Sequence, residues 1–377
     1  MKLLERNLDL LTGSSNMEDL HSMRNFPIFM GCVEHSESED IVADLTWQIS
    51  KDSGFIQLKK VIPLDYLYNK NHSNSVGEVW NEHHRKFSYF LSKSKPSSVF
   101  EIGGGRGILS KEYKKYGEIP WTILEPNPLP IEGCDAKFIK GFFDDKFLYD
   151  EYFDTVVHSH VFEHIYELNQ FMHHLASMIA EGKKLIFSVP NMQAMLERYY
   201  TNCINFEHTV FLTEPYIDYL LSKHGFKLLN KEYFMHNHSI FYETTRDSTI
   251  KPIDLTPNLY EKNKFLYNSY VKYHKDLISD INQKIDKADA SIYLFGAHVF
   301  SQYLIEMGLN ISKVVSLLDN DPFKQGKRLY GTSLMVQSPE TLQNVKSPIV
   351  ILKAGAYNIE IKNYILENIN NSVIFLE

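Results

Sequence analysis

The sequence predicts an α/β fold built on a doubly wound, mostly parallel sheet that an antiparallel hairpin closes. Short apolar runs alternate with helical stretches between residues 98 and 246, as the strand–helix units of a parallel sheet do. The last two runs, "FKLLNKEYF" and "HSIFYETTR", follow each other with no helix between them. Such neighbours pair as the two strands of a hairpin.

The parallel strands are expected in five apolar runs that follow Pro96. They comprise residues 98–102, 121–125, 137–140, 153–158 and 184–189. Helices are expected before the first run, at 76–95, and between later runs, at 107–116 and 166–180, because apolar positions recur there at helical spacing. A further helix ends at Gly225, just ahead of the hairpin.

Two smaller units are expected on either side of this sheet. Residues 1–75 are rich in Asn, Ser, Asp and Gly, and we interpret them as an N-terminal module of mostly irregular structure. The sheet then occupies residues 76–246. A Pro-rich connector and one long amphipathic helix over 258–288 follow, and residues 247–377 are predicted to form a second, Rossmann-like domain.

Composition narrows the class of protein. The chain has 377 residues, 44% of them hydrophobic, which is enough for two or three packed units. A net charge of −8 without a long Lys/Arg run argues against a nucleic-acid partner. The three cysteines lie far apart and predict neither a disulfide framework nor a zinc cluster. With no signal-peptide core and no window of about 18 apolar residues, we expect a cytoplasmic protein without a membrane partner.

The stretch "FEIGGGRG" predicts a ligand cradle between the first strand and its helix. Gly103, Gly105 and Gly107 alternate along it, and Glu101 stands two residues before the first glycine. Glycine lets the backbone approach a ligand, and the helix start presents free N–H groups. The spacing differs from the G-x-G-x-x-G of dinucleotide sites. The carboxylate would repel a pyrophosphate and suits a ligand with a cationic amino-acid end.

S-adenosylmethionine (SAM) has such an end, with an ammonium group and a sulfonium close by. Glu125 ends the next strand, where a carboxylate accepts hydrogen bonds from ribose hydroxyls. Phe142 and Phe143, in "GFFDD", are candidate adenine contacts, and His160 follows the fourth strand at the same sheet edge. We therefore predict SAM as the cofactor. The alternative is a dinucleotide site, or glycines that only shape a turn.

The segments "FEIGGGRG", "ILEPN", "VVHSHVFEHI" and "FSVPN" together resemble the class I SAM-dependent methyltransferases. With the flanking units, including "LLDNDPFKQGKRLYGT", the whole chain resembles the sugar C-methyltransferases. Those enzymes act on nucleotide-linked deoxy-keto-sugars in antibiotic and surface-polysaccharide pathways. Their N-terminal module holds zinc through two pairs of cysteines. Here Ser50 and Ser53 stand at the spacing of the second pair, and serine is a poor zinc ligand, so we expect no metal.

The resemblance also implies site residues. The family carries a Tyr-x-Glu-His-type motif after the fifth strand, which here reads "NFEH". By that likeness His208 is the general base, Glu207 its orienting partner and His164 a second active-site histidine. Asn205 replaces the tyrosine and is a candidate substrate contact.

Other candidate contacts to the substrate lie outside the core of the predicted sheet. The segment ahead of the sheet folds over the site in the family, which makes Tyr68 and His72 candidate substrate contacts. In the C-terminal unit, Lys324, Lys327 and Arg328 could attract an anionic diphosphate or form a solvated charged turn.

The predicted function is methyl transfer from SAM to a small-molecule substrate: a nucleotide-linked sugar or similar phosphorylated precursor of a surface polysaccharide (capsule or lipopolysaccharide) or natural product. Carbon methylation needs a ketone, a base and an oxyanion partner, whereas oxygen or nitrogen methylation needs alignment and sometimes a base. The family resemblance favours carbon. O- or N-methylation of a related nucleotide-linked conjugate and a SAM-binding scaffold without turnover stay open.

Overall fold

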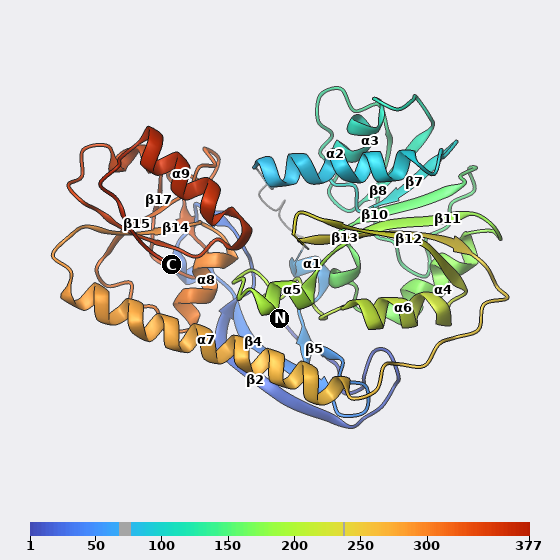
Figure 1. The fold of residues 1–377 in the computed structure, drawn as a ribbon, viewed down its shortest axis with the longest axis horizontal. Helices are drawn as coiled ribbons and strands as arrows, with labels where there is room; N and C mark the ends of the chain where they lie inside the picture. Colours follow the sequence, from blue (N-terminus) through green and yellow to red (C-terminus); the bar gives the residue numbers. More distant parts are fainter. Residues whose placement is uncertain (68–76, 237) are drawn as a thin grey trace.

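The computed structural model describes residues 1–67, 77–236 and 238–377; the candidate contacts Tyr68 and His72 lie outside these ranges. Figure 1 shows two sheets beside each other, the main one from cyan to yellow-green and the second from orange to red. The blue N-terminal strands and one long helix run along the lower edge between them.

The main sheet confirms the predicted fold class. Its strand order is β12-β13-β11-β10-β7-β8-β9. The strands are β7 (Val99–Ile102), β8 (Trp121–Glu125), β9 (Lys137–Lys140), β10 (Thr155–Ser159), β11 (Lys184–Pro190), β12 (Phe226–Phe234) and β13 (Ser239–Arg246). Strands β7 to β11 pair in parallel, and β13 is antiparallel to both of its neighbours. The predicted hairpin therefore closes the sheet, with its second strand inserted next to β11.

Helices cover both faces of this sheet because its strands are apolar on both faces. They are α2 (Glu78–Ser92), α3 (Ile108–Tyr113), α4 (Leu168–Met178), α6 (Glu214–Lys223) and the short η2 (Phe162–His164). Helix α5 (Met192–Glu197) follows β11 and packs instead into the core around Trp47. In β10, Val156 packs with α4 and α6, whereas its neighbour Val157 packs with α2 and α3. Because β7 to β11 are parallel, the loops that follow these strands all leave the sheet at its carboxyl edge, where ligands bind in such folds.

The N-terminal residues form an antiparallel sheet, so the prediction of mostly irregular structure was wrong. The elements of this region are β1 (Leu4–Glu5), β2 (Met17–Pro27), β3 (Cys32–Val33), η1 (Glu37–Glu39), β4 (Val42–Ser50), β5 (Ile56–Leu58), β6 (Lys60–Val61) and α1 (Leu64–Leu67). Strands β2, β4 and β5 pair in that order. The pairing of β2 with β4 shifts register at Asp19/His21 and at Met23/Phe26, and these irregularities interrupt the alternation that would identify a strand.

A second parallel sheet confirms the predicted C-terminal αβ unit. Helix α7 (Leu259–Lys287) leads into it, and its strand order is β17-β15-β14-β18-β19. The elements are β14 (Ile292–Phe295), α8 (Val299–Glu306), β15 (Val314–Leu318), β16 (Arg328–Leu329), β17 (Val336–Gln337), η3 (Pro339–Leu342), β18 (Ile349–Leu352), η4 (Gly355–Tyr357), α9 (Asn358–Asn368) and β19 (Ile374–Leu376). Strand β16 pairs with β3 near the N-terminus instead of joining this sheet.

One hydrophobic core joins the N-terminal sheet, α7 and the second sheet. It contains Trp47 of β4, Phe206 of the loop after α5, Tyr270 of α7 and Leu294 of β14, each no more than 1% exposed. A division of the chain at residues 75 and 246 stays a prediction. The N-terminal and C-terminal units on either side of the main sheet contribute side chains to one hydrophobic core.

The charged segment that leads into β16 forms ion pairs, of which those of Lys324 and Arg328 are buried and that of Lys327 is with the exposed Glu34. Arg328 binds Asp40 with two N–H groups, at 2.7 and 2.9 Å. Lys324 lies 3.0 Å from Asp319, and Lys327 lies 3.5 Å from Glu34. Each cation is thus paired with a carboxylate. None of the helices within the described ranges is both long and apolar enough to cross a membrane.

Candidate active site

The loop between β7 and α3 has glycines where neighbouring side chains leave no room for a Cβ atom. Gly103 and Gly107 adopt left-handed backbone angles, with φ of 69° and 77°. A Cβ on Gly107 would lie 2.3 Å from the Cys134 sulfur, and one on Gly103 would lie 2.8 Å from Val161. Side chains at these two positions would push the loop out of place.

Glu101 lies beneath this loop and is not among the described residues that border the cavity discussed below, so its direct contact with the cofactor stays a prediction. It is 2% exposed, and its Oε2 accepts a hydrogen bond of 2.7 Å from the Trp121 indole. A Cβ on Gly104 would lie 2.7 Å from its carboxyl carbon. Burial raises the pKa of Glu101 to about 7. Its charge can reach a ligand only through the loop.

Glu125 is held rigidly at the end of β8. Its two carboxylate oxygens accept hydrogen bonds from the backbone N–H groups of Gly105, at 3.0 Å, and Asn127, at 3.1 Å. Each oxygen retains capacity for another donor. Because Glu125 also borders the cavity described next, it is placed to accept hydroxyl donors from a ligand.

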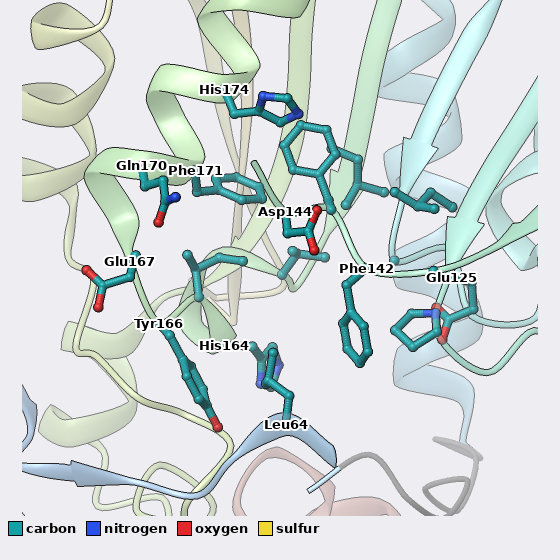
Figure 2. A pocket seen from close by; sticks show the side chains of 18 of the residues that line it. Leu64, Glu125, Phe142, Asp144, His164, Tyr166, Glu167, Gln170, Phe171 and His174 are labelled. Carbon is teal, nitrogen blue, oxygen red and sulfur yellow. The ribbon is translucent and has the colours of Figure 1, made fainter. Parts of the chain in front are cut away.

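A cavity of about 560 Å³ lies above the glycine loop (Figure 2). The predicted cofactor residues that border it are Gly103, Glu125, Phe142, Phe143 and His160; Gly105 and Gly107 belong to the loop but not to the lining. Phe143 also packs against Phe171 and His174, so it is partly a core residue. Figure 2 shows Phe142 extending from its loop toward the space that Glu125 and His164 border. Leu64 of α1 closes the cavity from the N-terminal side.

His160 marks the end of β10. Its φ of 53° is left-handed, a conformation that costs a side-chain-bearing residue of order 1–3 kcal/mol. Its backbone N–H donates to the Ser188 carbonyl at 2.8 Å. Its ring contacts Ser239 Oγ through Nε2 at 3.1 Å and lies 3.3 Å from a Glu163 oxygen through Nδ1. The strained turn thus aims the imidazole at the buried carboxylate of Glu163.

His164 and His208 come together although they lie on different loops. Their ring centroids are 5.3 Å apart, and His164 Nδ1 donates to the Glu207 backbone carbonyl at 2.9 Å. Burial lowers the pKa of His164 to about 4, and it also lowers the pKa of His208, against the opposing charge of Glu163. Both rings are therefore neutral near pH 7, as a base must be before it accepts a proton.

Asn205 shapes this loop, and its predicted contact with the substrate stays a prediction. Its Oδ1 accepts hydrogen bonds of 2.8 Å from the backbone N–H groups of both Glu207 and His208. Its Nδ2 donates to the Asn202 carbonyl at 3.0 Å. The side chain is 1% exposed, and its hydrogen-bonding groups already hold the turn that presents His208.

The N-terminal strands fix the same loop from outside. Leu58 N–H donates to the Thr209 carbonyl at 2.9 Å, and Phe211 N–H donates to the Ile56 carbonyl at 2.9 Å. The buried Arg6 guanidinium donates to the carbonyls of Thr209, at 3.1 Å, and Tyr166, at 2.8 Å. The N-terminal sheet thus acts as a support for the histidine pair.

A second cavity, of about 510 Å³, lies between the two parallel sheets. Trp80, Asn205 and His208 line it from one side; Gly296, Asp319 and Tyr357 line it from the carboxyl edge of the second sheet. Glu207 borders both cavities, so they meet at the histidine pair. A small molecule in the second cavity would face a ligand in the first across His164 and His208.

Several of these residues escaped sequence reasoning. Trp80 and Tyr357 carry no motif that marks them, and Asp144 and Asp319 stand in quoted segments without having been singled out; the fold brings all four to a cavity. Glu163 was visible in "FEHI", but its burial at 1% exposure was not. One ligand atom each of Glu163, His164 and His208 lies within 4.8 Å of the others, close enough for a metal ion to be considered.

Comparisons with known proteins agree with this geometry. Residues 78–231 match a family model described as a methyltransferase domain, and a search of curated proteins finds no match.

Three solved structures are similar to part of the chain. The N-methyltransferase NodS from Bradyrhizobium japonicum WM9 is 16% identical, with 46% of this chain and 100% of that chain covered and a TM-score of 0.35. Magnesium protoporphyrin IX methyltransferase from Synechocystis PCC 6803 is 17% identical, with 48% of this chain and 91% of that chain covered and a TM-score of 0.36. The PH0226 protein from Pyrococcus horikoshii OT3 is 16% identical, with 49% of this chain and 97% of that chain covered and a TM-score of 0.39.

The strand order and the family match together define a class I methyltransferase domain. The protein is a methyltransferase, and its cofactor is SAM. The match ends within β12 and includes neither the N-terminal sheet nor the second parallel sheet. The likeness to the sugar C-methyltransferases is therefore not part of this assignment.

Proposed function

We propose that the enzyme transfers a methyl group from SAM, held in the first cavity, to a sugar-sized acceptor in the second. The observation that carries this proposal is the meeting of the two cavities at Glu207, His164 and His208. SAM supplies an electrophilic methyl group on a sulfonium. The acceptor's nucleophile must reach that methyl group in line, with water excluded.

The chain's own residues suit both tasks. The carboxylate of Glu125 would accept hydrogen bonds from ribose hydroxyls, and Phe142 with Asp144 would hold the adenine. His208 would take the acceptor's proton at its unprotonated ring nitrogen, because its ring lines the second cavity and is neutral near pH 7. The backbone carbonyl of Glu207 orients His164, so the Glu207 side chain need not act as the orienting group.

For the acceptor we propose a nucleotide-linked sugar or a related precursor of a surface polysaccharide or natural product, with carbon methylation. The order of the three units along the chain and the position of the second cavity between two sheets support this proposal. The test is incubation with SAM and a panel of nucleotide-linked keto-sugars. S-adenosylhomocysteine release identifies the acceptor, and deuterium exchange at its α-carbon identifies carbon methylation.

One observation favours nitrogen methylation as the second candidate. The described lining of the second cavity carries Asp319, Asp321, Glu360 and Glu207, whereas its one described cation, Lys324, is paired with Asp319. An acidic wall attracts an amine and repels a diphosphate. Release of S-adenosylhomocysteine with amino-sugar acceptors, without α-carbon exchange, would establish this alternative.

A scaffold without turnover predicts a different outcome. It would bind SAM and release no S-adenosylhomocysteine with any member of either panel.

A further inference from the structure

Glu163 is a buried carboxylate with no hydrogen-bond donor in the part of the chain that the structure describes. Its residue is 1% exposed, and neither oxygen accepts a hydrogen bond from any described residue. The nearest nitrogens are His160 Nδ1, at 3.3 Å, and His164 Nε2, at 3.7 Å. An ionised carboxylate in such a place is costly unless a cation or a set of donors compensates it.

The hydrogen bonds of His164 and His208 fix which of their ring nitrogens carries the proton. A backbone carbonyl can only accept, so His164 Nδ1, 2.9 Å from the Glu207 carbonyl, must carry the ring proton. The neutral ring therefore leaves its Nε2 unprotonated, facing the Glu163 oxygen. His208 Nδ1 likewise lies 3.4 Å from the Cys203 carbonyl. Electron pairs that face each other repel unless a positive ion lies between them.

Histidines that bind a metal ion show this same arrangement. Their second ring nitrogen usually donates to a backbone carbonyl or a carboxylate, which fixes the tautomer and aims the other nitrogen at the metal. In this protein the ligand atoms of Glu163, His164 and His208 all lie within 4.8 Å of one another. Bonds of about 2.0–2.2 Å in a tetrahedral arrangement put ligand atoms roughly 3.3–3.6 Å apart, so the most distant side chains would move closer by about 1.3 Å.

We propose that Glu163, His164 and His208 bind one divalent transition-metal ion where the two cavities meet. Two imidazoles and one carboxylate form a donor set that suits Zn²⁺, Fe²⁺, Co²⁺ or Mn²⁺. Three protein ligands leave coordination positions free, and both His208 and Glu207 border the second cavity. The free positions face the place of the acceptor.

This site deepens the proposed function and rests on it for its chemical role. An acceptor carbonyl oxygen on the ion would make the neighbouring C–H bond more acidic, because a bound cation polarises the carbonyl and stabilises the enolate charge that forms when the proton leaves. That proton passes to water in the cavity, and His208 then serves as a ligand in place of the base. The metal-binding claim itself needs no acceptor and can be tested without one.

The test uses the full chain, freed of metal with a chelator and titrated with Zn²⁺ by calorimetry and with Co²⁺ by visible absorption. We expect one ion per chain and the absorption of a low-symmetry Co²⁺ site. Glu163→Gln and His208→Ala should each weaken binding more than about 100-fold. His173→Gln is the control, because His173 is exposed on α4 and lines neither cavity. Unchanged S-adenosylhomocysteine binding shows that each variant is folded.

The outcomes separate the two proposals. No stoichiometric binding, or binding that Glu163→Gln and His208→Ala leave unchanged, overturns the metal site. Methyl transfer by the metal-free enzyme at the full rate overturns its catalytic role and leaves the methyltransferase proposal intact. One bound ion per chain without transfer to any sugar acceptor keeps the metal site and removes the proposed acceptor.

Discussion

Glu101 places a negative charge under the glycine loop, where it can respond to a cation above it without touching it. Its carboxylate is shielded by the loop and bonded to Trp121, and burial raises its pKa to about 7. A SAM molecule carries positive charge on its sulfonium and ammonium groups. Its binding and the ionisation of Glu101 are therefore coupled.

This coupling predicts that SAM affinity depends on pH. Below pH 7 the free protein holds Glu101 protonated, so binding must release a proton; above pH 7 the carboxylate is already charged. The affinity should rise about three- to tenfold from pH 6 to pH 8 and then level off. Calorimetric titration at several pH values measures it. Glu101→Gln should flatten the profile, and a variant that keeps the full pH dependence would exclude Glu101 as its source.

A second prediction is that replacing His208 lowers the rate of turnover and leaves cofactor affinity nearly unchanged. Because it lines the second cavity and not the first, His208→Ala should reduce kcat by roughly 10²–10⁴-fold, the usual contribution of proton transfer or acceptor activation. The Kd for S-adenosylhomocysteine should change less than about twofold. Rapid-quench assays and calorimetry check the two quantities. A variant that turns over at the wild-type rate would remove His208 from the mechanism.

At the scale of single residues, the sequence predicted where a residue lies in the fold better than it predicted what its side chain contacts. Glu125, Phe142, His160 and His164 were placed correctly at the carboxyl edge because strand ends can be read from apolar runs. Asn205 was expected to contact the substrate; it borders the second cavity and also holds a turn, a role that the sequence did not predict. Whether a side chain faces a ligand or the backbone depends on contacts that no local pattern encodes.

At the scale of helices, strands and loops, prediction from the sequence is limited by contacts between distant parts of the chain. The loop that carries His208 is shaped by such contacts. Arg6 reaches Tyr166 and Thr209 across 160 and 203 residues of sequence. The strands of the main sheet were found within two residues of their ends, since their runs are apolar on both faces. The irregular N-terminal strands, which hold Arg6 in place, were missed.

Removal of Arg6 should therefore affect both stability and turnover. Arg6→Met keeps most of the buried volume but removes the side-chain donor to the Tyr166 carbonyl and leaves the Thr209 carbonyl with the Leu58 N–H alone. Each buried group that loses its partner costs about 1–3 kcal/mol, so the Tm should fall by several degrees. The kcat should fall with it, because Thr209 follows His208 directly. Arg24→Met, at an exposed position on β2, is the control and should change neither. Loss of stability with unchanged kcat would show that the loop keeps its geometry unaided.

The whole molecule is held together by contacts between its two ends. Strand β16 pairs with β3, and the shared core contains Trp47, Tyr270 and Leu294. The sequence predicted three consecutive units because composition changes at their borders, yet composition says nothing about which interiors merge. Such merging depends on the packing of side chains more than 200 positions apart, as Trp47 and Leu294 are.

The Arg328–Asp40 pair tests this union of the two ends. Both side chains are at most 10% exposed, and Asp40 also accepts the Gly331 N–H at 2.7 Å. Arg328→Met leaves a buried carboxylate without its cation, which costs about 3–5 kcal/mol. Asp40→Asn in the same chain removes the stranded charge, so the double variant should unfold at a higher denaturant concentration than Arg328→Met alone. A double-mutant cycle from urea unfolding gives the coupling energy. Additive single effects would mean that the pair contributes nothing to joining the N-terminal sheet and the second sheet.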